Sequence, residues 1–303
     1  MRQNIKKKLK ISVHIPFYLN KDKFKKFRIL KKVCNSYLKL SKETKIFIHT
    51  NIKFKLKNKK INILFYNLKN IHPFRLTWFP RKLMKKQTNN FDIFIYAEDD
   101  VLFTKKNLKY WLNHKNVCIE NKFNLGFLRI EKNNHLFAID QIKKFSFFKK
   151  INNKRFAIVE NPYCAMWIYE KKEFKKFIKS KYFNFKWDMN KIGKVNLDRE
   201  MSGIGWHGQD IKKGFNMGHY IATIIPINKN KLDTGSYIKH LPNNYSKNPA
   251  GLFGTIKLND LMKKNLTKFK KPSKMKLLSY KTLFNLYSLF RINLKDLKKG
   301  LIN

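Results

Sequence analysis

The sequence predicts an α/β fold built on a mostly parallel sheet flanked by helices. Over the first 120 residues, short β-rich runs alternate with segments whose apolar residues recur at helical spacing. The strongest run, FDIFIYA at 91–97, has the continuous apolar character of a strand that is buried on both faces. The chain has 303 residues and is 43% hydrophobic, so it can bury a large core. Strands separated by helices form parallel sheets, and this alternation sets the fold class.

The first half supplies its elements in a regular order. A helix is expected over 21–40, where apolar side chains recur every three or four residues. A second helix is expected to begin near Pro80, because proline suits the first helical turn, and a third after Thr104, a good N-cap residue. The strands are expected between these helices, at 11–17, 45–50, 61–66 and 91–97.

After Leu125 the pattern changes to short β-like runs and loops. The runs are NLGFLRIE, HLFAID, RFAIVE, YCAMWIYE and HYIATIIPI. A helix is expected at about 171–180, and the weak periodicity of 184–218 predicts a long loop. We expect one domain at 1–260, with halves at about 11–120 and about 121–260, and a basic, partly amphipathic helical C-terminal extension at 261–303.

The formal net charge is +49, with 68 Lys and Arg against 19 Asp and Glu. A charge of this size favours attraction to nucleic acid or to an anionic membrane surface. Arginine, the better residue for bidentate phosphate and base recognition, makes up only 8 of the 68 basic residues. The charge therefore indicates a compositional background and does not by itself assign a function.

The cysteines and the apolar segments bear on the compartment. Cys34, Cys118 and Cys164 are widely spaced and form no CxxC pair, which fits a reducing cytoplasm rather than a disulfide scaffold or a zinc cluster. The apolar stretch near the N-terminus is short, so no signal peptide is expected, and no run of 18 apolar residues predicts a membrane span. We expect a cytoplasmic protein, with peripheral contact at the inner face of the membrane left open.

Three acidic residues, Glu98, Asp99 and Asp100, stand side by side at the carboxyl end of the strongest strand. Ligands of open α/β sheets bind beyond the carboxyl ends of the strands. Adjacent carboxylates repel one another and need a compensating cation, and such oxygen ligands suit Mg²⁺ or Mn²⁺. The alternative is a solvated acidic turn at a helix N-terminus. Because acids are scarce in this chain, we interpret the triplet as a site.

The run YAEDDVLF at 96–103 resembles the DxD-type motif of GT-A fold glycosyltransferases. The resemblance is clearest over about 11–120 and implies a GT-A-like, Rossmann-like sheet. It also implies that the motif holds a divalent cation and the diphosphate of a nucleotide-sugar donor. Asp100 is then expected to contact the metal, and Glu98 and Asp99 to contact the metal or the nucleotide. The first position is Glu rather than Asp, so the individual roles stay open.

The same resemblance implies further donor and metal contacts. The segment after the first strand lies against the nucleotide base in GT-A enzymes, so Pro16, Phe17 and Tyr18 are expected to line that pocket, with ordinary strand-end packing as the alternative. Arg81 is expected to contact the nucleotide on other grounds: in a chain that otherwise uses lysine, an arginine is informative, because its guanidinium suits a diphosphate or a carboxylate. A histidine late in the domain completes the metal shell in many of these enzymes, and His240 matches that placement, with a structural histidine as the alternative.

An inverting transfer needs a general base that takes the proton of the acceptor hydroxyl. Acids are scarce in the second half of the chain, and the irregular segment 196–210 holds three of them. We place Glu200 first as the base, with Asp198 and Asp210 behind it. A solvated loop carboxylate is the alternative for each of them.

We therefore expect a glycosyltransferase that uses Mn²⁺ or Mg²⁺. It moves a sugar from a nucleotide-sugar donor to a hydroxyl of a glycan or lipid-linked acceptor, in cell-surface polysaccharide or lipopolysaccharide synthesis. The alternative is a basic nucleic-acid binding protein, or a metal-dependent nuclease that uses the same triplet. Scarce arginine and the absence of RRM, KH or helix-turn-helix patterns argue against it, so nucleic acid is not an expected partner. A relative that keeps the fold without chemistry is a third option.

Overall fold

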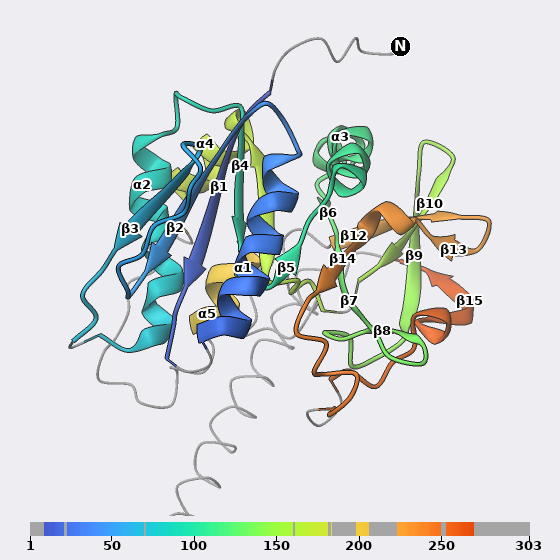
Figure 1. Cartoon of the computed structure of the whole chain (residues 1–303). Coiled ribbons are helices and arrows are strands. Elements are labelled where there is room, and N and C mark those ends of the chain that lie inside the picture. Colours follow the sequence, from blue (N-terminus) through green and yellow to red (C-terminus); the bar gives the residue numbers. More distant parts are fainter. Residues whose placement is uncertain are drawn as a thin grey trace, which may run out of the picture.

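The computed structural model describes residues 9–20, 23–69, 71–159, 161–180, 183, 198–205, 223–249 and 253–269. Within these ranges the chain forms a mixed α/β structure with three sheets (Figure 1). None of the helices in this part of the chain is both long and apolar enough to cross a membrane.

A five-stranded sheet of order β11-β4-β1-β2-β3 forms one side of the molecule (Figure 1). β1 pairs in parallel with β2 and β4, β3 pairs in parallel with β2, and β11 closes the other edge antiparallel to β4. The mostly parallel sheet predicted from the sequence is confirmed. Its strands are β1 (Lys10–Phe17), β2 (Glu43–Thr50), β3 (Ile61–Phe65), β4 (Ile93–Ala97) and β11 (Met166–Glu170).

Helices cover both faces of this sheet, and the strand alternation sorts the side chains between them. Ile11, Val13 and Ile15 are fully buried in the core shared with α1 (Lys23–Leu38) and α3 (Lys105–Glu120). Successive strand residues point to opposite faces, so Ser12 and His14 face the other side, covered by α2 (Pro80–Lys86) and α4 (Lys171–Lys179). The core on that side is largely aromatic. The four helices expected from the sequence are therefore present.

The second half builds a separate sheet of order β13-β12-β10-β9-β15, with β6 paired to β12. Figure 1 shows it beside the first sheet, with α3 near the junction. Its strands are β6 (Asn124–Leu125), β9 (Phe145–Ile151), β10 (Lys154–Ile158), β12 (Thr223–Asn228), β13 (Lys231–Leu232) and β15 (Met262–Lys268).

The strand β9 was not expected, because its string FSFFKK fits an amphipathic helix equally well. It is a strand because it pairs antiparallel with β10 across a two-residue turn. That turn consists of Asn152 and Asn153, whose φ angles of 45° and 61° suit a hairpin turn of type I′. The Asn-Asn pair was the local signal that would have indicated the hairpin.

A small four-stranded sheet of order β5-β14-β7-β8 joins the two halves. β5 follows the acidic triplet directly, and β14 pairs with it antiparallel and with β7 in parallel. This sheet therefore brings a late segment of the chain against the end of β4. Its strands are β5 (Val101–Leu102), β7 (Leu128–Lys132), β8 (Leu136–Ala138) and β14 (Tyr237–His240).

Three expectations need correction. The two halves do not separate at residue 120, because β11 and α4 belong to the first sheet and its core. There β11 pairs with the edge of β4 that would otherwise have no neighbouring strand. The stretch 184–218 is not loop throughout, since α5 (Asp198–Ile204) is helical. The extension from 261 is not helical at its start, since β15 adds to the edge of the second sheet beside β9. The remainder of both segments lies outside the described residues.

Candidate functional site

The pairing of β5 with β14 brings Asp100 and His240 together. His240 lies opposite Val101 in the register, and the Leu241 amide donates to the Asp100 carbonyl at 2.9 Å. The side chains follow, with His240 Nε2 at 3.2 Å from Asp100 Oδ2. Two residues 140 positions apart in the chain therefore meet at the carboxyl end of β4.

Glu131 on β7 holds the other side of the His240 ring. Its carboxylate is fully buried and contacts His240 Nδ1. It also accepts hydrogen bonds from the amides of Asn244 and Ser246, at 3.1 and 2.6 Å. Burial alone would lower the pKa of His240, but the hydrogen bonds to Asp100 and Glu131 raise it to about 9. Glu131 thus orients the imidazole so that Nε2 faces Asp100.

Asp100 carries an unsatisfied buried oxygen. Its Oδ1 is shielded from solvent and has no hydrogen-bond partner among the described residues. Burial alone would raise the pKa of Asp100, but the hydrogen bond and charge of His240 lower it. An ionised carboxylate with an unpartnered buried oxygen is costly unless a cation or donor meets it. The donor set of one carboxylate and one imidazole nitrogen fits Mn²⁺ better than Mg²⁺, which prefers oxygen ligands, and His240 would bind such an ion after Nε2 gives up its proton.

Glu98 turns away from this pair. Its Oε1 accepts a hydrogen bond of 2.7 Å from the Tyr163 hydroxyl, and its side chain is 8% exposed. Burial raises the pKa of Glu98, and the nearby positive charge of Arg199 opposes that rise. Among the described residues, no three His, Cys, Asp or Glu side chains form a group that could hold a metal. The predicted ligand set of Asp100, Glu98 and His240 is therefore not assembled as a trio.

Asp99 and Asp100 are similarly accessible, with 20% and 23% of their side chains exposed. Burial of the carboxyl and repulsion from Asp100 raise the pKa of Asp99 to about 7. Lys26 Nζ lies 3.8 Å from Asp99 Oδ2 and donates to the Tyr18 carbonyl at 2.9 Å. Lys26 thereby ties the end of β1 to the end of β4.

Of the predicted base candidates, the structure describes the side chain of Glu200 alone. Glu200 lies on α5, with its Oε1 3.3 Å from Arg199 Nη2, and its Oε2 is buried without a partner in the described part of the chain. Arg199 also interacts electrostatically with Glu98 and Asp100, so α5 lies near the triplet. The side chain of Asp198 and the whole of Asp210 lie outside the described residues.

The predicted base-pocket residues are mostly packed into the core. Phe17 is fully buried and packs against Phe27 and Phe54, at 5.4 and 5.9 Å between ring centroids. Pro16 is buried and Tyr18 is half-buried at the end of β1. The strand alternation directs Phe17 toward α1, so its side chain does not line a base pocket.

Arg81 is also a core residue. Its guanidinium lies 4.0 Å from the Trp78 ring centroid and donates to the Phe183 carbonyl at 3.0 Å, and the side chain is 5% exposed. Burial lowers the pKa of Arg81 to about 9. Because the Arg81 guanidinium is enclosed by aromatic side chains, the structure does not support the predicted contact between Arg81 and a nucleotide. The rarity of arginine, which pointed to Arg81, applied equally to Arg129 and Arg199, whose charges do act on two carboxylates of the triplet.

A second buried network forms the wall beside Glu98. Arg129 makes a bidentate pair with Asp140, with Nε and Nη2 at 2.9 and 2.6 Å from the carboxylate oxygens. Its guanidinium also lies 5.2 Å from the ring centroid of Tyr163, which donates to Glu98. For Arg129 and Glu131 the sequence left open a structural ion pair with each other or a place near the sugar; Arg129 pairs with Asp140 instead. Tyr163 was not predicted, because it approaches Glu98 only through the pairing of β11 with β4.

Comparison with known proteins gave similarities among solved structures. No protein-family model matches the chain, and no curated protein matches it. The structure of S. aureus TarS 1-349 is 11% identical over 55% of this chain and 49% of that chain, with a TM-score of 0.32. A second structure of S. aureus TarS is 13% identical over 56% and 30%, with a TM-score of 0.34. The chain thus spans about half or less of these two structures.

A third solved structure is a glycosyltransferase involved in the glycosylation of the major capsid of PBCV-1. It is 12% identical to this chain, over 62% of this chain and 74% of that one, with a TM-score of 0.24.

Proposed function

We propose that the protein is a metal-dependent glycosyltransferase of GT-A type. One observation carries the proposal: Asp100 and His240 meet at the carboxyl end of β4, and Asp100 Oδ1 is buried without a partner among the described residues. The carboxyl edge of a parallel sheet is where α/β proteins bind nucleotides. The motif YAEDDVLF, by its resemblance, supports a nucleotide-sugar donor as that ligand.

Asp100 and His240 are the residues that would hold a Mn²⁺ or Mg²⁺ ion. Such ions are commonly held by one or two protein ligands, and substrate phosphates complete the shell, so the pair is a sufficient protein contribution. When bound, the ion supplies positive charge that neutralises the departing diphosphate. Glu131 keeps Nε2 of His240 directed to the site, because its carboxylate contacts Nδ1.

The remaining groups bind and orient the reactants. In this proposal Asp99, partly exposed beside Lys26, accepts a hydrogen bond from a ribose or sugar hydroxyl. Arg199 supplies a fixed positive charge beside Glu98. Glu200 remains the first candidate for the general base, with Oε2 as the atom that takes the acceptor proton, and Asp198 and Asp210 remain behind it.

The acceptor is a hydroxyl of a glycan or lipid-linked glycan, as in cell-surface polysaccharide or lipopolysaccharide synthesis. The formal charge of +49 supports action at the anionic inner face of a membrane, where basic surfaces are attracted. A cytoplasmic location with peripheral membrane contact follows from the same proposal.

The experiment that tests this function is a thermal-shift screen of UDP-, GDP- and CMP-sugars with and without Mn²⁺. One donor should raise Tm only when the metal is present, because binding to the native state alone stabilises it. Asp100→Asn should abolish both that shift and donor hydrolysis, whereas the exposed Asp260→Asn should keep both. Full activity in Asp100→Asn would exclude the proposed role of this residue.

A further inference from the structure

A row of buried polar side chains crosses the α2 face of the first sheet, away from the site described above. Tyr66 contacts His49 Nδ1 at 2.9 Å, and His49 Nε2 contacts His14 Nδ1 at 3.0 Å. His14 Nε2 then contacts Gln87 Oε1 at 3.0 Å. Ser12 donates to the same oxygen at 3.1 Å. Ser12, His14 and His49 are fully buried, and the proposed glycosyl transfer uses none of these groups.

The direction of the hydrogen bonds in this row is determined by the Gln87 oxygen. With Oε1 as the shared acceptor, Nε2 of His14, which also lies 2.9 Å from the Ser12 hydroxyl, carries its hydrogen, and Nδ1 of His14 is then an acceptor. His49 therefore donates from Nε2, and its Nδ1 accepts from the Tyr66 hydroxyl. Both rings are neutral in this arrangement, in accord with the burial that lowers their pKa values, that of His49 to about 3. Each hydrogen bond in the row is thus donated in the direction of Gln87, and Oε1 of Gln87 is the final acceptor.

The row holds the Gln87 carboxamide in one orientation. Oε1 is occupied by Ser12 and His14, while Nε2 finds no acceptor in the described part of the chain. The Gln87 residue is 8% exposed and lines a cavity of about 280 Å³. Nε2 is not shielded from solvent. It is therefore a fixed hydrogen-bond donor that faces the cavity.

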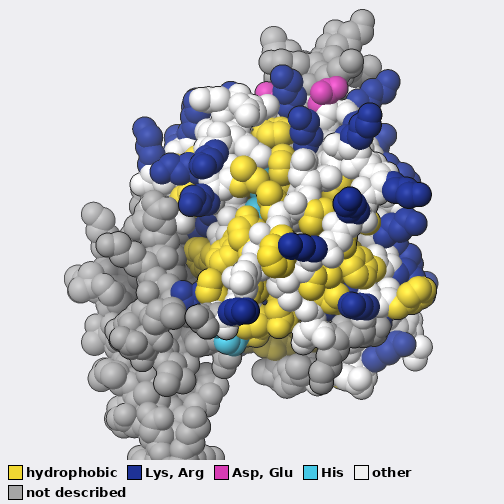
Figure 2. Space-filling view, turned by 60° about the vertical axis from the view of Figure 1, so that its left-hand side comes forward, with side chains coloured by type: hydrophobic (Ala, Val, Ile, Leu, Met, Phe, Trp, Pro, Cys, Tyr) yellow, Lys and Arg dark blue, Asp and Glu magenta, His cyan; other side chains and the backbone are white. Residues whose placement is uncertain are grey.

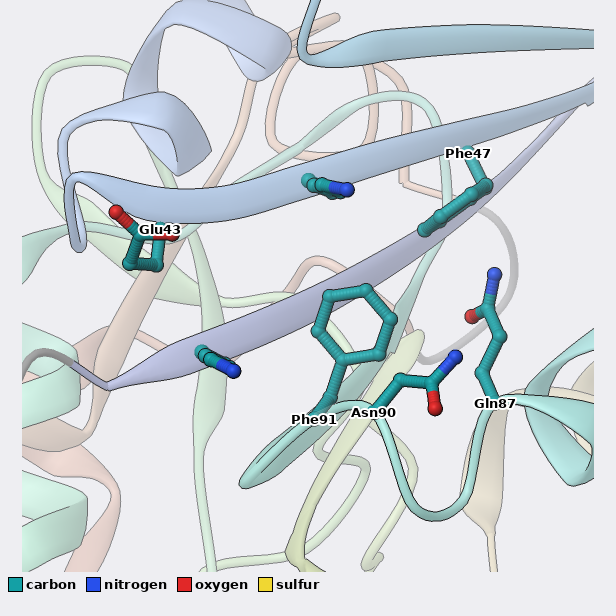
Figure 3. Close-up of a pocket in the computed structure, with 7 residues that line it drawn as sticks. Glu43, Phe47, Gln87, Asn90 and Phe91 are labelled. Atoms are coloured by element: carbon teal, nitrogen blue, oxygen red, sulfur yellow. The ribbon is translucent and has the colours of Figure 1, made fainter.

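The other walls of the cavity are aromatic and basic. Phe47 and Phe91 are nearly buried, with ring centroids 6.2 Å apart and planes at 87°. The side chains of Gln87, Asn90 and Phe91 point toward Phe47 across the cavity (Figure 3). Lys10, Lys45 and Glu43 complete the lining. The two lysines and one glutamate give the cavity lining a net charge of +1.

We propose that this cavity binds a small organic anion with a flat apolar body. Gln87 Nε2 and the two lysines provide donors for a carboxylate or phosphate, and the perpendicular rings of Phe47 and Phe91 suit a third ring that stacks on one and meets the edge of the other. A volume of about 280 Å³ accommodates one ring with its anionic group.

This binding site is separate from the proposed donor site. Lys10, Glu43 and Lys45 stand at the amino-terminal ends of β1 and β2, whereas the acidic triplet follows the carboxyl end of β4. From Lys10 to Phe17 the strand β1 covers roughly 23 Å, at about 3.3 Å per residue. The two sites therefore lie at opposite ends of one sheet, and the anion is not the transferred sugar or its donor.

Benzoate is the probe, with benzyl alcohol as an uncharged control of the same size. Titration of the 303-residue chain, followed by ligand-observed NMR, should give a Kd for benzoate about tenfold lower than for benzyl alcohol. Gln87→Glu keeps Oε1 for Ser12 and His14 but replaces the donor with an acceptor, and should weaken benzoate about tenfold. Lys45→Gln should weaken it about threefold, because the lysine is exposed.

The controls separate this binding from general charge and from the proposed function. Lys263→Gln removes the same charge from the exposed edge strand β15 and should leave the benzoate Kd unchanged. Asp100→Asn should also leave it unchanged, whatever its effect on transfer. Because Lys45 is exposed, its variant folds even where Gln87→Glu does not. Equal binding of benzoate and benzyl alcohol, no measurable binding of either, or an equal loss in Lys45→Gln and Lys263→Gln would overturn the proposal.

Discussion

At the scale of single residues, His240 is held by carboxylates on both ring nitrogens. Glu131 contacts Nδ1 and Asp100 contacts Nε2, while the amides of Asn244 and Ser246 hold Glu131 in place. Histidines that bind metals usually donate their second ring N–H to such a carboxylate. The loop after β14 thus positions Glu131, and Glu131 positions His240.

Glu131→Gln tests this arrangement. Oε1 of Glu131 contacts both His240 Nδ1 and the Asn244 amide, and Oε2 accepts from the Ser246 amide. A glutamine has only one oxygen for these three donors and meets at least one of them with its own NH₂ group, so it holds the imidazole less firmly. The Mn²⁺ affinity, measured by calorimetry without donor, should fall about 10- to 100-fold. Glu120→Gln, an exposed change on α3, should have no effect. Wild-type Mn²⁺ affinity in a folded Glu131→Gln protein would contradict the assignment.

At the scale of elements, the N-terminus of α3 is locked to the segment that precedes His240. Asn107 Oδ1 accepts from the Thr104 amide at 2.8 Å, so the predicted cap is confirmed as part of a capping box. Its Nδ2 donates to the carbonyls of Gly235 and Tyr237, at 2.8 and 2.7 Å. The same turn approaches α3 so closely that a Cβ on Gly235 would lie 2.5 Å from Tyr110 Cβ. Helix packing therefore contributes to the placement of His240.

Asn107→Ala should destabilise the protein by about 2–4 kcal/mol, because it removes the donor to one buried and one partly buried carbonyl and the partner of the helix cap. Urea unfolding followed by circular dichroism measures the change. Asn113→Ala, at an exposed position of the same helix, is the matched control and should cost less than about 0.5 kcal/mol. Equal effects of the two substitutions would show that Asn107 does not lock the helix.

The buried histidines under α2 predict an acid-sensitive stability. Burial lowers the pKa of His49 to about 3, so the folded state stays neutral where the unfolded state, near 6.5, takes up a proton. Stability is therefore fully present above pH 6.5 and is lost as pH falls toward 3, by about 1.4 kcal/mol per pH unit for each such histidine. The free energy of unfolding, measured between pH 6.5 and 5, gives this slope. His49→Phe should reduce the slope, whereas the surface change His135→Gln should retain it.

Sequence periodicity predicted the elements that are buried on a regular face. α1 to α4 and the parallel strands are present because their apolar positions recur with a helical or strand period. β9, α5 and β15 were missed for a common reason. Each is short or rich in lysine, and its structure depends on the neighbouring strand or helix rather than on its own pattern.

At the scale of the whole molecule, the basic residues are spread over the surface and surround apolar areas, as the face in Figure 2 shows. Exposed apolar side chains occur among them, such as Phe65 at 46% exposed with Lys53 Nζ at 5.4 Å from its ring centroid. A distributed positive charge attracts any polyanion but selects none.

Nucleic-acid binding should therefore be electrostatic and without sequence preference. The affinity for unrelated DNA duplexes should be equal and should fall about 10³-fold or more between 50 and 200 mM salt, as for six or more phosphate contacts. Filter binding across salt concentrations measures it. The Mn²⁺-dependent donor shift should persist at 200 mM salt, because it depends on a few buried groups. A strong preference for one sequence that survives 200 mM salt would favour the nucleic-acid alternative.

The amino-acid sequence by itself determined the fold class, the succession of strands and helices before the triplet, and the acidic triplet as the scarce feature at a strand end. These depend on local periodicity and on neighbouring residues, which the sequence displays directly. Only the tertiary structure decided which side chains join the triplet. In the small sheet, β14 pairs with β5 and β7, which lie more than 100 residues before it, and so brings His240 and Glu131 to Asp100. Arg81 and Phe17 lie in the core instead. Pairing between distant strands is a property of the folded chain, because no local pattern specifies which strand will lie beside β5.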